Sequence, residues 1–221
     1  MYRERAAVLP HVIAWRSVSP PGGGLKRILP DGCMDLIWQD GELFVAGPDT
    51  TAQLCAEVAG TRNLALRFAA GTGPLVLGVP ADELTDRRVP LDALWPVPVV
   101  RALTGITSVA ELERAVLDRW RPPDPVMVEV ARRARAGQSV DAIAAMCGLS
   151  ARHLQRRVRT AFGYGPKTLI RIMRLQRAVG LARRGTPFAA VSATTGYADQ
   201  AHLARDVKAL AGVPLGVLVS A

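Results

Sequence analysis

Polar side chains that can read nucleic-acid bases gather on one face of a single predicted helix. The segment 151–162 places Leu154 and Val158 on an apolar stripe at 100° per residue. The opposite face carries Arg152, Gln155, Arg156 and Arg159. Arg and Gln have forked donors that pair with base edges in the major groove of DNA. A solvated helix face has the same pattern, so this helix alone leaves both interpretations open.

The segment that carries these side chains occurs twice. "HLQRRV" begins at His153, and "HLARDV" begins at His202. The correspondence extends upstream, because Ser150 and Asp199 are both suited to cap a helix, and a glycine suited to a tight turn precedes each of them. The repeated unit is therefore two helices joined by a short turn, which is the helix-turn-helix arrangement.

A long helix is expected between the two copies. We expect helices over 126–136, 140–147, 151–162 and 166–183, followed by a second copy in which Thr186 caps a helix that has Pro187 at its first position. The connecting helix would span roughly 26 Å at about 1.5 Å per residue. With the width of the motifs added, the two recognition helices would lie about one DNA turn, near 34 Å, apart. The sequence thus predicts that one chain reads two successive major grooves.

Charge is unevenly distributed along the 221 residues. Residues 1–124 contain 13 Lys and Arg against 15 Asp and Glu, which is a net charge of −2. Residues 125–221 contain 15 Lys and Arg against four acids, which is a net charge of +11. A strongly basic half beside a near-neutral half indicates a polyanion-binding domain joined to a domain with another task.

Several classes of protein are disfavoured by the sequence. No apolar run is long enough for a membrane span, and the N-terminus lacks the apolar run of a signal peptide. Three cysteines without CxxC spacing fit a reducing compartment, so we expect a cytoplasmic protein. His11, His153 and His202 are isolated and no catalytic motif occurs. We therefore expect no metal, no cofactor, no membrane contact and no enzymatic activity.

Residues 125–221 resemble the DNA-binding domain of the AraC/XylS family of bacterial transcription regulators. The resemblance is carried by "SVDAIAAMCGLSARHLQRRVRTAFGYGPKTLIRIMRLQRAVGLA" and "PFAAVSATTGYADQAHLARDVKALAGVPLGVL". It implies seven helices, with two helix-turn-helix units on a connecting helix. It also implies a regulator that binds double-stranded promoter DNA and, as an activator, has RNA polymerase as a partner.

The resemblance assigns base contacts to the exposed faces of the third and sixth helices. The corresponding residues are Arg152, Gln155 and Arg156, with Arg159 on the same face, and then Gln200, His202 and Arg205. The second copy departs from the first, because it has alanine at positions 201 and 204 and Asp206 in place of Arg157. A carboxylate that faces DNA repels phosphate. We call the exposed face of each recognition helix a reader, and we expect the second reader to bind DNA more weakly than the first.

The N-terminal part reads as short strands separated by Gly, Pro, Asp and Asn. The expected strands are "LKRIL", "MDLIW", "LFVA", "LALRFAA" and "LVLGV". A helix over 109–120 follows, with Ser108 and Glu111 at capping-box spacing. The predicted class is α+β. It comprises a small β-rich domain over 1–121 that ends in a helix, a proline-rich linker over 122–125, and an all-α domain over 126–221 with two helix-turn-helix motifs joined by a long helix.

The stretches "LPDGCMDLIW", "LFVAGPDT" and "VLGVPADEL" resemble an uncharacterised domain that precedes this DNA-binding pair in many actinobacterial regulators. Together with the family resemblance, this implies a sensor or homodimerisation domain, cupin-like or a truncated β-barrel, that binds a small-molecule effector. The candidate ligand-binding residues are Trp15, Trp38, Arg67 and Phe68. The aromatic side chains equally suit a hydrophobic core, and Arg67 could either bind an anionic ligand or face solvent.

Two other functions stay open at this point. Cys33 lies between Asp31 and Asp35, so the chain could be a DNA reader fused to a thiol-based alkyl or redox sensor. Neighbouring carboxylates raise the pKa of a thiol, which opposes its reactivity. A non-specific architectural DNA binder is the other alternative. Capped helices with Arg and Gln on one face argue against it, because backbone binding requires only positive charge.

Overall fold

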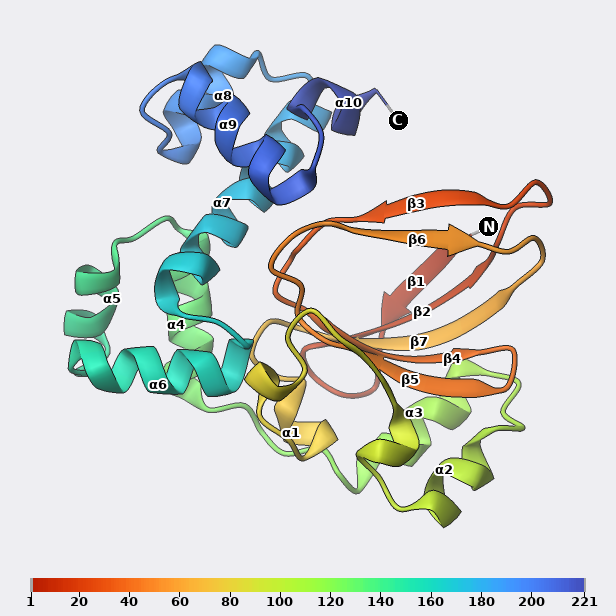
Figure 1. The fold of residues 1–221 in the computed structure, drawn as a ribbon. Coiled ribbons are helices and arrows are strands. Elements are labelled where there is room, and N and C mark those ends of the chain that lie inside the picture. Colours follow the sequence, from red (N-terminus) through yellow and green to blue (C-terminus); the bar gives the residue numbers. More distant parts are fainter. Residues whose placement is uncertain (1, 221) are drawn as a thin grey trace.

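The computed structural model describes residues 2–220, and its N-terminal part is built on two antiparallel sheets (Figure 1). The larger sheet has the strand order β1 (Tyr2–Ala6), β2 (Val12–Val18), β7 (Arg62–Phe68), β4 (Met34–Gln39), β5 (Glu42–Ala46) and β8 (Arg88–Pro90). The smaller sheet is a ribbon of β3 (Gly24–Ile28) and β6 (Gln53–Glu57). The ribbon lies over one face of the larger sheet, so the expected β-rich N-terminal domain is confirmed.

The two faces of the larger sheet differ because side chains alternate along each strand. On β4, Leu36 and Trp38 are buried, whereas Asp35 and Ile37 are half-buried. The face that carries Leu36 joins the N-terminal core with α2 (Val97–Leu103) and α3 (Val109–Leu117). The opposite face and the ribbon enclose a cavity. One sheet therefore supplies both the core and the floor of the cavity.

The prediction of a strand at "LVLGV" is wrong. This segment forms the short helix α1 (Pro74–Leu77), which has proline at its start and Gly78 in the left-handed region, at φ 81°, at its end. Proline followed by a C-terminal glycine is a helix signature, and in this segment it prevails over the strand preference of the apolar residues. Two 3₁₀ turns follow, η1 (Ala81–Glu83) and η2 (Leu91–Ala93).

The C-terminal part consists of helices within the described residues. They are α4 (Pro125–Arg135), α5 (Val140–Met146), α6 (Ala151–Phe162), α7 (Pro166–Arg183), α8 (Phe188–Thr195), α9 (Gln200–Ala211) and α10 (Leu215–Val219). The bounds predicted for α6 and α7 are confirmed. Helix α4 begins at Pro125, one residue earlier than predicted, because the carboxylate of Asp124 accepts a hydrogen bond from the Val126 amide and caps it.

Most of the predicted helix caps are confirmed by hydrogen bonds. Ser139, Ser150 and Asp199 accept hydrogen bonds from backbone amides at 3.2, 3.3 and 2.6 Å. Thr186 does not cap α8, because Pro187, with extended ψ, occupies the cap position and the helix begins at Phe188. The spacing of Ser108 and Glu111 does mark the start of α3, but the helix ends at Leu117 rather than at residue 120.

The connecting helix α7 joins two separate cores of the C-terminal part. Leu154, Val158 and Phe162 of α6 pack with α4, α5 and the first half of α7. Leu203 and Val207 of α9 pack with α8, α10 and the second half of α7. Each two-helix unit therefore has its own apolar support on α7. No helix among residues 2–220 is both long enough and apolar enough to cross a membrane.

Candidate nucleic-acid interface and cavity

The first reader is the exposed face of α6. Its buried side consists of Leu154, Val158 and Phe162, which fix the rotation of the helix. The side chains of Arg152 and Arg156 are exposed and form no hydrogen bond or ion pair within the described residues. Their guanidinium groups are therefore available for bases and phosphates, as the sequence predicts.

Two other predicted readers on α6 are partly engaged within the protein. The amide of Gln155 lies over Gly165, where an added Cβ would approach its Nε2 to 2.7 Å. Arg159 forms an ion pair with Asp82 of η1 at 3.4 Å, although 57% of the arginine side chain is exposed. An exposed pair of this kind contributes about 0–1 kcal/mol. Arg159 thus faces the N-terminal part as well as solvent.

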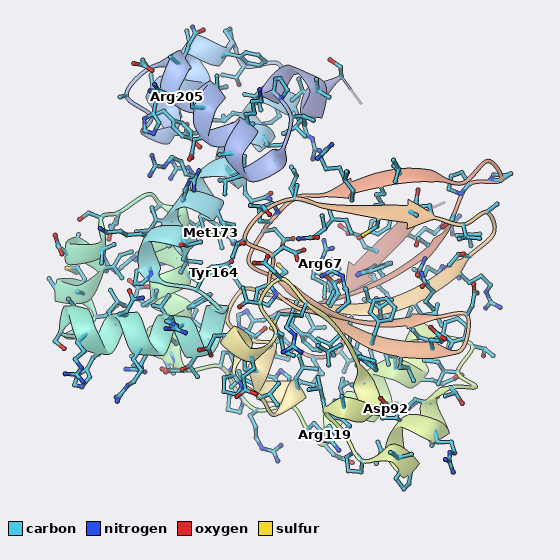
Figure 2. All side chains as sticks on the ribbon, in the orientation of Figure 1. Arg67, Asp92, Arg119, Tyr164, Met173 and Arg205 are labelled. Carbon is cyan, nitrogen blue, oxygen red and sulfur yellow. The ribbon has the colours of Figure 1, made fainter. Side chains whose placement is uncertain are left out.

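The second reader is the corresponding face of α9. Gln200 and Arg205 are exposed, and Arg205 lies on the side of this unit that is turned away from the sheets (Figure 2). His202 is half-buried. Its Nδ1 accepts a hydrogen bond from the Ala198 amide at 3.3 Å. Its ring packs edge-on against Tyr197, with ring centroids 5.1 Å apart. One nitrogen of His202 is therefore committed to the turn rather than to DNA.

Asp206 does not face DNA, contrary to the possibility raised by its position opposite Arg157 in the repeat. Its carboxylate is buried, forms an ion pair with Arg171 of α7, and accepts a hydrogen bond from the Tyr197 hydroxyl at 3.1 Å. Burial and the nearby Asp206 raise the pKa of Tyr197, so this hydroxyl stays protonated and keeps donating. Asp206 holds the second reader on the connecting helix.

A cavity of about 650 Å³ lies between the larger sheet and the ribbon. Its lining includes Trp15, Asp35 and Arg67 from the sheet, and it also reaches Gln176 and Arg183 of α7. Figure 2 shows Arg67 between the two β layers. The cavity is therefore in contact with the helix that connects the two readers.

Two of the four candidate ligand-binding residues lie at the cavity and two do not. Trp15 and Arg67 line it. Trp38 and Phe68 are buried in the N-terminal core on the opposite face, where the Trp38 indole donates to the Thr104 carbonyl at 2.9 Å. Neighbouring residues of a strand point to opposite faces, so Arg67 and Phe68 cannot both line the cavity. For Trp38 and Phe68 the core interpretation is correct.

Arg67 lines the cavity, but two carboxylates already compensate its positive charge. It is therefore neither a simple solvent-facing side chain nor a free anion-binding group. Its Nε donates to Asp35 Oδ1 at 3.2 Å, and its Nη1 lies 3.9 Å from Asp31 Oδ2. Burial acts to lower the pKa of Arg67, but the two carboxylates raise it above its ordinary value. The arginine remains charged between Asp31 and Asp35.

Cys33 is poorly suited to thiol chemistry. Burial, first, and then Asp31 and Asp35 raise the pKa of this thiol well above its usual value. The thiolate is the reactive form, so this environment suppresses nucleophilic attack near neutral pH. The thiol-sensor alternative therefore finds no support in the geometry around Cys33.

Comparisons with known proteins identify the helical region. Residues 143–219 match the family described as a helix-turn-helix domain, and residues 11–90 match a domain of unknown function (DUF6597). The C-terminal domain is an AraC-type helix-turn-helix domain. The AraC-type domain binds double-stranded DNA, and the chain is a DNA-binding transcription regulator. A search of curated proteins finds no match to the chain.

Similar solved structures are found at low sequence identity, one of them over almost the whole chain. ToxT from Vibrio cholerae is 10% identical, with a TM-score of 0.51 over 98% of this chain and 97% of that chain. The C-terminal domain of AraT, a response regulator from Geobacillus stearothermophilus, is 17% identical, covering 44% of this chain and 85% of that chain, with a TM-score of 0.41. A probable AraC family transcriptional regulator from Rhodopseudomonas palustris is 21% identical, covering 44% of this chain and 96% of that chain, with a TM-score of 0.38. The ToxT similarity shows a shared two-part fold.

The N-terminal part holds the C-terminal ends of both recognition helices, which the sequence does not predict. At the end of α6, the Thr85 hydroxyl donates to the Gly163 carbonyl at 2.8 Å. At the end of α9, Arg27 Nη1 donates to the Ala211 carbonyl at 2.8 Å, and the Ala52 amide donates to the Leu210 carbonyl at 2.7 Å. No motif signals these contacts, because they depend on how two separate folds meet.

The connecting helix is held as well. Gln176 Nε2 donates to the Pro30 carbonyl at 2.7 Å. Tyr164 and Met173 lie where the AraC-type domain faces the β layers (Figure 2), and a Cβ at Gly32 would come within 2.9 Å of the Met173 methyl group. The N-terminal part therefore touches α6, α7 and α9 together, and it constrains the spacing of the two readers.

Proposed function

We propose that this chain is a sequence-specific regulator in which α6 and α9 read successive major grooves, and in which a small molecule in the N-terminal cavity changes the affinity for DNA. The effector proposal rests on one observation: hydrogen bonds from the N-terminal part hold the C-terminal ends of both recognition helices. These contacts together are the grip. A ligand can shift an equilibrium only by binding one arrangement better than another. Here two of the residues that hold the helices, Arg27 and Pro30, also line the cavity.

Those residues lie in strand β3 and in the loop that follows it. Arg27 lines the cavity and donates to the end of α9, and Pro30 lines the cavity and accepts from α7. Movement of these residues around a ligand therefore moves the second reader relative to the first. The prolines before α4 add a covalent tether, but the direct contacts provide the shorter route from the cavity to the readers.

The gripped arrangement favours the lower-affinity state. It places Asp82 beside Arg159 on α6, and Glu83 is its neighbour on η1. Carboxylates close to a DNA-reading helix repel phosphate and occupy an arginine that could otherwise bind it. Release of the grip therefore raises the affinity for DNA.

The reading of DNA by one chain can be tested by selection and footprinting. Full-length protein should select an asymmetric site from a random duplex library and, as a monomer, protect about two helical turns on one face. The affinity should fall steeply with salt because the +11 region neutralises phosphates. Protection of a single groove, or the absence of any selected sequence, would contradict the two-reader geometry.

The grip can be tested by adding one methyl group at Gly71. This glycine has φ +84°, and a Cβ there would lie 2.8 Å from Phe162 Cε1 at the end of α6. Gly71→Ala should push α6 away from the sheet domain and raise DNA affinity about two- to fivefold, the scale of the lost surface ion pair. The response to a bound effector should shrink in parallel. Affinity is measured by fluorescence anisotropy on the selected site.

Gly60→Ala is the matched control for backbone strain. Gly60 also has positive φ, at +76°, but an added Cβ meets nothing within 4 Å. The control should lose a similar amount of stability and keep the wild-type DNA affinity. If both variants change affinity equally, or Gly71→Ala changes nothing, the contact at Phe162 does not restrain the reader.

A further inference from the structure

The floor of the cavity is organised in three rows that run across the strands. Arg67 pairs with Asp35 in the first row. Trp15, Ala65, Ile37 and Phe44 form the second, apolar row. Ser17, Asn63 and Gln39 form the third row, which is polar but uncharged. Rows one and three are four residues apart along a strand, which corresponds to about 13 Å.

The charged row has one more negative than positive charge. Arg67 is shared by Asp35 and Asp31, and the Trp15 indole also donates to Asp35 at 2.7 Å. Burial raises the pKa of Asp35, and burial followed by the two carboxylates raises the pKa of Cys33. The negative charge at this end of the cavity follows from the geometry, because one guanidinium is shared by two carboxylates. An anionic ligand would have to displace a carboxylate from Arg67, whereas a cation would complete the charge balance.

The other charged residues of the lining are four cations and two carboxylates, so the excess of negative charge is confined to the end of the cavity that holds Asp31, Asp35 and Arg67. Asp49 forms a two-pronged pair with Arg88, with both N–O distances at 3.3 Å. On the ribbon, Lys26 lies over the Tyr2 ring and Glu57 supplies the opposite sign. Arg27 is hydrogen-bonded to Ala211 of the AraC-type domain, and Arg183 is the last residue of α7 in that domain. The uncompensated carboxylate is therefore that of Asp31.

The third row offers neutral hydrogen-bonding groups. Gln39 Nε2 donates to Asn63 Oδ1 at 2.9 Å, and Asn63 Nδ2 donates to the Ser17 hydroxyl at 3.2 Å. This chain of bonds leaves the Gln39 carbonyl oxygen as an acceptor and the Ser17 hydroxyl hydrogen as a donor. Both suit a hydroxyl or carbonyl group on a ligand, and neither suits a second charge.

We propose that the cavity binds a small molecule with a protonated amine against Asp31 and Asp35, an apolar planar body over Trp15, Ile37 and Phe44, and an uncharged hydrogen-bonding group about 13 Å away at Ser17 and Gln39. This assignment rests on the proposed effector role of the cavity. Ala65, between Trp15 and Ile37 in the second row, is fully buried, so the apolar side chains of this row that line the cavity are Trp15, Ile37 and Phe44. A protonated amine next to an aromatic wall also gains cation–π attraction.

The test uses matched pairs of arylalkyl amines and arylalkyl carboxylates with phenyl, indolyl and naphthyl bodies, each with and without a ring hydroxyl. Binding to the full-length chain is measured by isothermal titration calorimetry. Amines should bind, the corresponding carboxylates should bind at least tenfold more weakly, and the hydroxyl should strengthen binding. Preferential binding of the carboxylates, or binding of neither class, overturns the assignment.

Asp31→Asn locates the site. The amide oxygen can still accept the Cys33 backbone amide, which donates to Asp31 Oδ1 at 2.8 Å, so the loop is retained while the charge is removed. Amine affinity should fall about tenfold, whereas Asp92→Asn, an exposed carboxylate on η2 remote from Arg67 in Figure 2, should leave it unchanged. Equal amine affinity in the wild type and Asp31→Asn would overturn the site even if amines bind elsewhere.

The same ligands separate the two proposals when DNA affinity is measured in parallel. Amine binding that leaves DNA affinity unchanged would remove the effector role while confirming the amine site. A carboxylate that binds and changes DNA affinity would support effector control and overturn the amine assignment. Amine binding that shifts DNA affinity in the wild type, with both effects reduced in Asp31→Asn, supports both.

Discussion

Replacement of Arg156 and Arg205 by alanine should weaken binding of the selected DNA site by about 30- to 2 × 10⁴-fold in the double variant. Each arginine occupies the exposed face of a recognition helix and has no partner of its own within the described residues. A bidentate contact from arginine to guanine contributes about 1–3 kcal/mol, and contributions from well-separated positions add. Anisotropy titrations on the selected duplex give the affinities.

The single variants show which base position of the DNA site each arginine recognises. Arg156→Ala should relax one base position in one half of the site, and Arg205→Ala should relax one in the other half. Arg101→Ala, an exposed arginine of α2 in the N-terminal part, serves as a charge-matched control that should change neither affinity nor sequence preference. If repeated selections return the same preferred sequence for all three variants, these arginines bind phosphate only.

The local structure of the AraC-type domain could be predicted because its signals are local. Ser139, Ser150 and Asp199 cap helices in the structure, and the apolar stripe of Leu154 and Val158 fixes the orientation of α6. Caps and 3.6-residue periodicity depend only on residues within one or two turns. The repeat doubles the evidence, since each copy supports the interpretation of the other.

The N-terminal part was less predictable because strand faces are assigned by tertiary contacts. Trp38 and Phe68 are core residues, whereas Trp15 and Arg67 line the cavity, and residue type alone does not distinguish them. The period-2 rule separates Phe68 from Arg67 only after one face is known to be the core. Arg67 is the useful signal: a charged residue within an apolar strand marks the face that is not core.

Side chains at the junction of the two parts escaped prediction for the same reason. Asp82 and Thr85 follow a short helix and give no sign of contact with α6, which lies about 70 residues further along the chain. Asp206 looks like a surface residue in the repeat alignment, yet it is buried against α7. Its partner Arg171 is 35 residues away, beyond the range of any local pattern.

Asp206→Ala should destabilise the second helix-turn-helix unit by about 2 kcal/mol while leaving the first intact. The substitution removes the partner of Arg171 and the acceptor of the Tyr197 hydroxyl. Hydrogen bonds to charged groups contribute about 1.5–3 kcal/mol, but 43% of the Arg171 side chain is exposed and can be rehydrated, which lowers the loss. Denaturant unfolding of the full-length chain measures the difference.

The effect on DNA follows from the position of the network. Asp206 joins α9 to α7, so its loss frees Arg205 from a fixed orientation without removing any base contact. The half of the footprint on the α9 side should weaken, while contacts from Arg152 and Arg156 persist.

Asp206→Asn should recover part of the stability, because the amide oxygen still accepts a hydrogen bond from the Tyr197 hydroxyl. Asp141→Ala, an exposed carboxylate at the start of α5, controls for the change in net charge. If Asp206→Ala weakens both halves of the footprint equally, the two units do not fold on α7 as separate bodies, and the two cores must instead unfold as one.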